Sequence, residues 1–404
     1  MKILLSAYAC EPGVGSEPEV GWRWAVGLVG LGHEVWVLTR ANNRPAIEKG
    51  CAGLALTGKL HFLYYDLPPW GRWWKRGRRG IHLYYLLWQW RARGLARATH
   101  AKVGFERVHH VTLVSGRQPS FLESLGVPFV FGPVGGGERA PFRLRFGYGL
   151  RAWVEELLRD GLNALVRFDP LLRRTYRRAA QIYVTSAESG RFVPARERAK
   201  TRIELAIGLD PDELAAPLPA GKVGKGLRLL YVGRFLDLKG MHLGLPAFAA
   251  LTRANPDARL TLLGDGPDKA HWRKMVERLG LADRVAWREW TAREKLGAVY
   301  AEHDLFFFPS LRDSGGLVVL EAMAHGLPVL CLDRGGPGVI VNEACGRVVT
   351  TKGKDRKAVI AALGEALCEL DRDADLREQL SEGARKRVRA FTWAEKVARI
   401  MAEA

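Results

Sequence analysis

Short apolar runs alternate with longer stretches of mixed polarity along the first half of the chain. The runs typical of strands are Lys2–Ala7, Val35–Thr39, Glu106–Leu113, Pro128–Gly132 and Gln181–Thr185. Between the first two lies a stretch that contains a helix and ends at the turn Gly32-His33. Repeated strand–helix units with apolar strands predict a parallel, doubly wound sheet.

The alternation resumes after a segment rich in proline and glycine, 211–226, which is typical of a linker. Strand-like runs follow at Leu229–Val232 and from Leu260, and an amphipathic helix begins near Phe391. A chain of 404 residues is too long for one ordinary core. We therefore predict an α/β protein with two doubly wound, Rossmann-like domains, 1–210 and 227–390, and a terminal helix within 391–404.

Composition excludes several classes of protein. The hydrophobic content of 48% is enough for sizeable cores, and the five cysteines have no paired spacing that would indicate disulfides or zinc. No uncharged apolar run reaches the length of a membrane-spanning helix, and the first run is too short for the core of a signal peptide. We expect a cytoplasmic protein.

The segment Pro309–Pro328 combines carboxylates and glycines in a way that suits phosphate binding. Asp313 and Glu321 stand eight residues apart, with Ser314-Gly315-Gly316 and a short apolar run between them. A glycine-rich turn leading into a helix presents unpaired N–H groups, and these and the helix dipole favour an anion. An acid on each side can hold the hydroxyls of a sugar and of a ribose. The alternative is a buried helix with an acidic N-cap.

Two cations follow a strand-like run farther upstream. Arg234 comes directly after Leu229–Val232 and Gly233, and Lys239 follows one turn later. Such cations suit a diphosphate leaving group, because negative charge builds on it as its bond to the sugar breaks. A further run, Leu260–Asp268, enters a Gly-x-Gly turn. The alternative is a pair of solvated loop charges, but the order of the motifs favours a phosphate site.

This order resembles the family-4 retaining glycosyltransferases of the GT-B fold, also described as glycosyl transferases group 1. The family pattern is G-R-x-x-x-x-K-G, then G-x-G-x, then E-x7-E, matching Gly233–Gly240, Gly264–Pro267 and Asp313–Glu321. The resemblance covers essentially the whole chain and is most specific over Leu229–Val349. Asp313 is a departure, since the family usually has Glu there and Asp is shorter by one methylene.

The resemblance implies two Rossmann-like domains that face a cleft, with the terminal helix crossing back to the first domain. It implies that Arg234 and Lys239 bind the donor diphosphate, and that Asp313 faces the transferred sugar. Glu321 would hold the ribose. Because the cations and the helix N-terminus would bind the phosphates and stabilise their charge, no metal or other cofactor is expected. The implied donor-binding positions are Gly13, Gly15, Gly233, Gly264, Asp265, Gly315, Gly316, Leu317 and Glu321.

The family often has His-x-His at the end of the strand that corresponds to 106–113, with one histidine beside the anomeric carbon of the donor. This chain has His109-His110 followed by valine. A shift of register would make His110 catalytic and His109 an acceptor contact. The alternative is a pair of structural histidines. The candidate catalytic residues are therefore Arg234, Lys239, Asp313 and His110.

Three consecutive glycines, 135–137, follow the predicted strand 128–132. Such a run costs too much chain entropy to be a casual turn, and it lets backbone approach a ligand closely. We expect Gly136, Gly137 and Glu138 to bind the acceptor, with a flexible loop facing the other domain as the alternative.

The net charge of +19 implies an anionic partner. The insertion 68–104 holds nine Lys and Arg and no Asp or Glu, interleaved with tryptophan and tyrosine. This mixture suits an anionic membrane surface, where cations meet lipid headgroups and rings lie at the interface. The alternative is a helical subdomain in which the tryptophans are core and the arginines are solvated. We expect peripheral association with the inner face of the cell membrane.

The resulting prediction is a retaining, metal-independent glycosyltransferase whose acceptor is a lipid-linked or polysaccharide intermediate. The donor is a nucleoside-diphosphate sugar, with uridine and guanosine both open. A nucleotide-sugar epimerase or a phosphorylase of the same fold is the first alternative. A basic nucleic-acid-binding protein is the second, which the charge permits but no motif supports, so no nucleic acid is expected as a partner.

Overall fold

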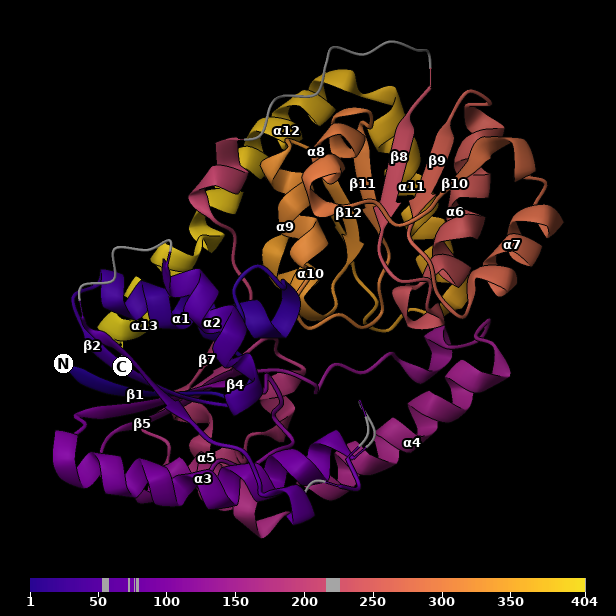
Figure 1. Cartoon of the computed structure of the whole chain (residues 1–404). Coiled ribbons are helices and arrows are strands. Elements are labelled where there is room, and N and C mark those ends of the chain that lie inside the picture. The colour runs from indigo at the N-terminus through magenta and orange to yellow at the C-terminus, as the bar shows by residue number, and fades with distance from the viewer. Residues whose placement is uncertain (53–57, 72, 76, 78–79, 216–225, 404) are drawn as a thin grey trace. The chain divides into compact units, whose positions relative to one another are not determined.

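The computed structural model describes residues 1–52, 58–71, 73–75, 77, 80–215 and 226–403. The chain divides into two compact units (Figure 1). Unit 1 comprises residues 1–137, 161–207 and 393–404, and unit 2 comprises residues 138–160 and 208–392. The boundary predicted at 210 therefore lies near the observed one, but the segment 138–160, predicted within the first domain, clusters with unit 2.

Unit 1 is built on a sheet of seven strands. All pairings between them are parallel, in the order β3-β2-β1-β4-β5-β6-β7. The strands are β1 (Lys2–Ala7), β2 (Glu34–Thr39), β3 (Leu60–Tyr64), β4 (Arg107–Thr112), β5 (Phe129–Val134), β6 (Gln181–Val184) and β7 (Thr201–Ile203).

Helices cover both faces of this sheet. Figure 1 shows α3 and α5 on one side, and α1, α2 and α13 on the other. Along β1, Leu4 packs into one apolar cluster whereas Ile3 and Leu5 pack into the opposite one, because successive strand residues point to opposite faces. The helices are α1 (Ser16–Gly30), α2 (Arg44–Ala52), α3 (Ile81–Val103), α5 (Pro170–Arg178) and α13 (Trp393–Glu403).

The terminal helix belongs to unit 1. α13 packs on α1, and the buried ammonium of Lys396 donates a hydrogen bond to the carbonyl of Leu205 at 2.7 Å. Arg399 also pairs with Glu204 at 2.9 Å. The last part of the chain therefore completes the unit that the first part begins.

Unit 2 has a second parallel sheet of six strands, in the order β10-β9-β8-β11-β12-β13. Here too, helices lie on both sides of the sheet (Figure 1). The strands are β8 (Arg228–Val232), β9 (Arg259–Leu263), β10 (Val285–Arg288), β11 (Leu305–Phe308), β12 (Val329–Leu332) and β13 (Gly346–Val349). The helices are α6 (Met241–Ala254), α7 (Lys269–Arg278), α8 (Arg293–Ala301), α9 (Leu317–Ala324), α10 (Gly335–Ile340), α11 (Arg356–Arg372) and α12 (Ala374–Val388).

Ionic and hydrogen-bonding contacts explain why 138–160 belongs to unit 2. The segment includes the first part of α4 (Leu150–Val166), where Glu156 pairs with Arg312 at 2.9 Å. The backbone N–H of Gly149 also donates to the carboxylate of Asp237 at 2.6 Å. Both Glu156 and Asp237 are buried, and a buried charge needs such partners. Sequence periodicity carries no signal for these contacts.

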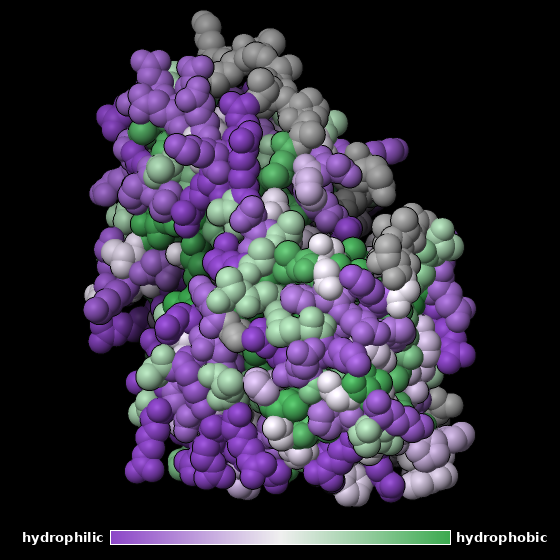
Figure 2. Space-filling model, turned by 90° about the vertical axis from the view of Figure 1, so that its left-hand side faces the viewer, coloured by the Kyte–Doolittle hydropathy of each residue, from purple (hydrophilic) through white to green (hydrophobic). Residues whose placement is uncertain are grey.

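The prediction of two doubly wound α/β domains is confirmed. Hydrophilic side chains predominate on the face shown in Figure 2, with apolar ones in separate areas between them. None of the helices in the described parts of the chain has the length and apolar character that crossing a membrane requires.

Candidate functional site

The predicted cations lie after β8, where glycines allow two turns to approach closely. Gly233 has a φ of +153°, and the turn after β9 packs on it so tightly that a Cβ on Gly264 would lie 2.1 Å from the Gly233 carbonyl oxygen. The hydroxyl of Tyr231 donates to the carbonyl of Arg234 at 3.0 Å and holds this turn. Larger residues at the two glycine positions would separate the turns.

Arg234 is exposed at this edge of the sheet. Among the residues that the structure describes, no acceptor or carboxylate pairs with its guanidinium. Asp265, on the neighbouring turn, forms an ion pair with Lys269 at 3.2 Å, and its backbone carbonyl accepts from Phe235. The guanidinium of Arg234 is therefore available to a ligand, whereas the Asp265 side chain already has a partner.

Lys239 is directed toward the segment that follows β11. Its ammonium lies 2.6 Å from a carboxylate oxygen of Asp313 and 5.2 Å from the centre of the Phe308 ring. Gly240 makes this approach possible, because its φ is +79° and a Cβ there would lie 1.8 Å from the carbonyl oxygen of Pro309. The structure thus brings Lys239 and Asp313 together, although they are 74 residues apart.

Asp313 links Lys239 to the start of α9. One carboxylate oxygen accepts from the N–H groups of Gly315 at 3.0 Å and Gly316 at 2.9 Å, and the other faces Lys239. Burial acts to raise the pKa of Asp313, but the charge of Lys239 and the two amide donors outweigh it and lower the pKa below its usual value. Asp313 is therefore an ionised carboxylate that holds the turn before α9 and pairs with Lys239.

The N-terminus of α9 presents backbone N–H groups that could bind a ligand. In the described part of the chain, the N–H groups of Leu317 and Val318 have no hydrogen-bond partner. Gly316, at the cap, has a φ of +78°. These two amides and the positive end of the helix dipole form an anion-binding arrangement beside the Lys239–Asp313 pair.

Glycines of α10 hold this loop in place, which sequence reasoning missed. The N–H of Gly336 donates to the carbonyl of Asp313 at 2.7 Å, and a Cβ on Gly335 would lie 2.0 Å from that same oxygen. The sequence feature that could have predicted this contact is a glycine-rich turn after an apolar strand, Asp333-Arg334-Gly335-Gly336-Pro337-Gly338.

Glu321 lies on the second turn of α9 and is half-buried. The hydroxyl of Tyr300 donates to its carboxylate at 3.2 Å, and the ring of His325 stacks on Tyr300 with centroids 4.9 Å apart. Tyr300 fixes one orientation of the Glu321 carboxylate. Neither aromatic residue was predicted to take part.

The predicted glycines of unit 1 have different surroundings. Gly13 and Gly15 precede α1 with φ of +73° and +70°, and both have open space where a side chain would be. Gly137 instead packs against backbone, since a Cβ there would lie 2.5 Å from the Cα of Ser189. Gly136 has a φ of +98°, and its carbonyl accepts from Arg117 at 3.5 Å. Glu138 is buried at the start of the unit 2 segment.

His109 and His110 lie in the core of unit 1 on opposite faces of its sheet. His110 contacts the hydroxyl of Tyr85 at 3.1 Å, and His109 contacts the carbonyl of Gly132 at 2.8 Å. Each is 1% exposed, and burial lowers the pKa of His110 to about 3 and that of His109 to about 4. This burial favours the alternative of two structural histidines, while the roles predicted for His110 in catalysis and His109 in acceptor binding stay predictions.

The aromatic residues of the insertion 68–104 divide between core and surface. Tyr84, Tyr85 and Trp88 of α3 are buried, and the indole of Trp88 donates to the carbonyl of Tyr65 at 2.7 Å. Trp70 and Trp73 are 71% and 76% exposed, and Trp90 is 46% exposed. The predicted insertion of these rings into a membrane included Trp88, and its burial assigns that residue to the core instead. Arg76, Arg78 and Arg79, three of the nine cations predicted to meet lipid headgroups, lie outside the described residues.

Comparison with known proteins first defines the class. The chain superposes on sucrose-phosphate synthase from Thermosynechococcus elongatus with a TM-score of 0.62 at 20% identity, covering 100% of this chain and 97% of that one. It superposes on Alr3699/HepE of Anabaena, solved in complex with UDP, with a TM-score of 0.58 at 14% identity and full coverage of both chains. At these identities the likeness shows the fold alone, and that fold is GT-B.

The family match is narrower than the fold match. Residues 219–387 match the family model of glycosyl transferases group 1, which confirms the predicted resemblance at that level for this region. A D-inositol 3-phosphate glycosyltransferase of Corynebacterium urealyticum is 30% identical over 219 residues, which is 52% of this chain and 47% of the relative. The chain thus spans about half the length of the curated relatives it matches. Membership of family 4 stays a prediction.

Proposed function

We propose that this chain is a retaining glycosyltransferase that moves a sugar from a nucleoside-diphosphate sugar to an acceptor without a metal. The observation that carries the proposal is the Lys239–Asp313 pair at the start of α9, beside the amides of Leu317 and Val318, which no described residue accepts from. The group 1 match over the same region supports it.

The departing diphosphate gains negative charge as its bond to the sugar breaks. Arg234 and Lys239 supply two positive charges, and the start of α9 adds about half a charge through its dipole. Asp313 offsets one of them in the free protein. A bound diphosphate therefore competes with Asp313 for Lys239 and is held by Arg234 and the amides of α9. In this way the protein's own cations do the work that a divalent metal does in other sites.

Asp313 also has capacity left for the sugar. A carboxylate can accept at about four lone-pair positions, and three of those of Asp313 are used by Gly315, Gly316 and Lys239. We assign the remaining position to a sugar hydroxyl. Glu321, oriented by Tyr300, is assigned to the ribose hydroxyls.

We propose that Gly13 and Gly15 of unit 1 face the donor. Gly136 and Gly137, at the end of a unit 1 segment, and Glu138, which begins the unit 2 segment, are proposed to contribute to the acceptor site. Uridine diphosphate is the first nucleotide to test, because HepE, which shares the fold, was solved with UDP. A guanosine nucleotide is the second.

The acceptor is proposed to be a lipid-linked or polysaccharide intermediate at the inner face of the cell membrane. The exposed rings of Trp70, Trp73 and Trp90 support this, because indoles beside cations favour the lipid interface. The excess of 62 Lys and Arg over 43 Asp and Glu favours an anionic surface.

A panel of UDP- and GDP-sugars tests the reaction class. We expect release of free nucleoside diphosphate that chelator does not abolish, and transfer to acceptor with the anomeric configuration of the donor. Accumulation of an epimerised sugar nucleotide would instead indicate an epimerase, and a requirement for inorganic phosphate would indicate a phosphorylase. Stoichiometric binding to oligonucleotides without donor turnover would support the nucleic-acid alternative.

A further inference from the structure

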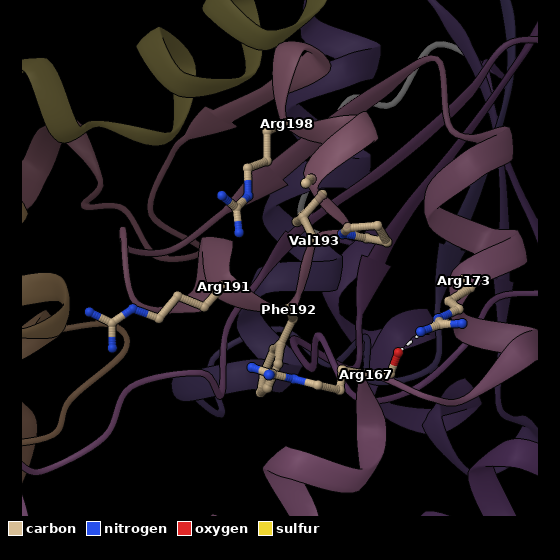
Figure 3. Close-up of a pocket in the computed structure, with 8 residues that line it drawn as sticks. Arg167, Arg173, Arg191, Phe192, Val193 and Arg198 are labelled. Atoms are coloured by element: carbon tan, nitrogen blue, oxygen red, sulfur yellow. Dashed lines mark hydrogen bonds between the residues drawn. The ribbon is translucent and has the colours of Figure 1, made fainter.

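Unit 1 contains a pocket of about 320 Å³ that lies outside every predicted site. Four arginines line it, and Figure 3 shows that they come from separate segments: Arg167 follows α4, Arg173 belongs to α5, and Arg191 and Arg198 follow β6. The buried side chains of Phe192 and Val193 also line the pocket. No acidic residue is among its described lining residues.

No ion pair with a described residue involves the four arginines of this pocket. In the described part of the chain, Arg167, Arg191 and Arg198 make no side-chain hydrogen bond or ion pair. Arg173 donates to the carbonyl of Arg167 at 2.8 Å, which leaves its charge uncompensated.

The nearest carboxylates along the chain already have other partners. Glu197 pairs with Lys200 at 2.8 Å, and Asp169 accepts from the first amides of α5 at 2.8 and 3.2 Å. A pocket lined by four guanidinium groups, with no carboxylate in its described lining, suits an oxyanion, because each guanidinium can donate two parallel hydrogen bonds.

Exposed apolar side chains precede Arg167 along the chain, and one of them contacts Arg173. Phe168 is 66% exposed, and the guanidinium of Arg173 lies 5.8 Å from the centre of its ring. Leu162 and Leu165, on the last turns of α4, are 56% and 68% exposed. Leu157 and Leu158, on an earlier turn of this helix, are exposed as well. An apolar surface beside a cationic pocket fits a ligand that is anionic at one end and apolar at the other.

We infer that this pocket binds the phosphate headgroup of an anionic membrane lipid, while Leu162, Leu165 and Phe168 enter the apolar layer beside it. A soluble phosphate would use the arginines but would leave the three apolar side chains in water. Charge complementarity and exposed apolar area together therefore favour a lipid. The inference rests on the proposed membrane location of the enzyme, but it is independent of the sugar chemistry in unit 2.

Co-sedimentation with lipid vesicles tests the pocket directly. The variant is Arg191→Glu with Arg198→Glu, and the matched control is Arg196→Glu with Arg202→Glu. The control arginines are also exposed, change the net charge equally and do not line the pocket. Vesicles contain phosphatidic acid, phosphatidylglycerol or phosphatidylcholine, and circular dichroism checks that each variant is folded.

The parent should bind the anionic vesicles and bind phosphatidylcholine weakly. The pocket variant should lose about tenfold or more of that affinity, and the control should lose much less, since only the pocket holds the headgroup. Phe168→Ser should weaken vesicle binding at every salt concentration, because salt does not screen the apolar contribution of this ring. Equal losses in the pocket variant and the control would overturn the inference, as would displacement of the protein from vesicles by inorganic phosphate with no effect of Phe168→Ser.

Donor hydrolysis in solution separates this inference from the proposed function. All three variants should release nucleoside diphosphate at the parental rate, because the altered residues lie outside the donor site. A parent that binds vesicles through the pocket but turns over no donor would leave the lipid site standing and remove the glycosyltransferase proposal. A parent that turns over donor but sediments with no vesicle would leave the glycosyltransferase proposal standing and remove the lipid site.

Discussion

The candidate residues of unit 2 and those of unit 1 were chosen by the same motif reasoning, yet the structure treats them differently. In unit 2, Lys239 and Asp313 meet at the start of α9, and the guanidinium of Arg234 has no partner among the described residues. In unit 1, both histidines are buried in the core. The difference lies in what each motif constrains. A glycine that must adopt positive φ fixes the path of the backbone near a charged residue, and the sequence shows that glycine. A histidine in a strand does not reveal from sequence which face of the sheet it occupies or how deeply it is buried.

The core role assigned to Trp88 gives the largest expected effect. Trp88→Ala should lower the free energy of unfolding by about 3–5 kcal/mol, because it removes a fully buried ring and leaves a cavity. Trp90→Ala, two positions along the same helix, should change it by no more than about 0.5 kcal/mol. Urea denaturation of both variants measures this contrast. A Trp88→Ala variant that keeps its stability but binds vesicles poorly would contradict the core role and indicate that Trp88 contacts lipid.

The buried histidines predict an acid-labile unit 1. Their folded pKa values, about 3 for His110 and about 4 for His109, lie below the unfolded value of about 6.5. Their neutral forms therefore contribute stability that is fully present above pH 6.5 and is lost as the pH falls toward 4. Each histidine should contribute a slope of about 1.4 kcal/mol per pH unit in that window.

The variant His110→Phe isolates one of the two slopes. Its stability should depend less steeply on pH between 6.5 and 4 than that of the parent, whatever its absolute stability, as urea midpoints at several pH values would show. Donor turnover at neutral pH should persist in the folded variant. An unchanged slope together with lost turnover would instead support the catalytic role predicted for this histidine.

Substitutions of Asp313 and Glu321 should affect the binding of different ligands, and the expected effects are smaller. Asp313→Asn keeps an oxygen for the amides of Gly315 and Gly316 but removes the charge facing Lys239. It should preserve or improve binding of the nucleoside diphosphate while weakening use of the intact sugar donor by about tenfold. Glu321→Ala should weaken both ligands by a similar factor, because the ribose is common to them. Calorimetric titration with both ligands measures this, and identical profiles for the two variants would remove the distinction.

Most of the fold was predictable, because apolar runs bounded by glycine mark parallel strands at both ends of the chain. Lys2–Ala7 was predicted with its observed bounds as β1. The runs at β11 and β12 were not assigned, since four apolar residues in a row fit a strand or a buried helix equally well. The placement of 138–160 in unit 2 depends on tertiary ion pairs that no local pattern encodes.

The candidate site was predictable where backbone geometry demanded a residue type and unpredictable where only packing decided. Gly233, Gly264 and Gly316 all adopt positive φ, which is why glycine patterns found them. Tyr300 and the Gly335-Gly336 pair contact the site from elements far along the chain. The alternating aromatics of α3 could not be divided between core and lipid from sequence, because both environments favour tryptophan.

The turnover of donor by Lys239→Ala, measured beside Lys274→Ala, tests the central claim most directly. Lys274 is an exposed lysine of α7 with no assigned role, so its loss removes the same charge from the same unit. Lys239→Ala should lower the rate of nucleoside diphosphate release by about two to three orders of magnitude, the scale for losing one preorganised contact to a developing charge. Lys274→Ala should retain the parental rate. Parental turnover by a folded Lys239→Ala variant would contradict the assignment of this site to the departing diphosphate.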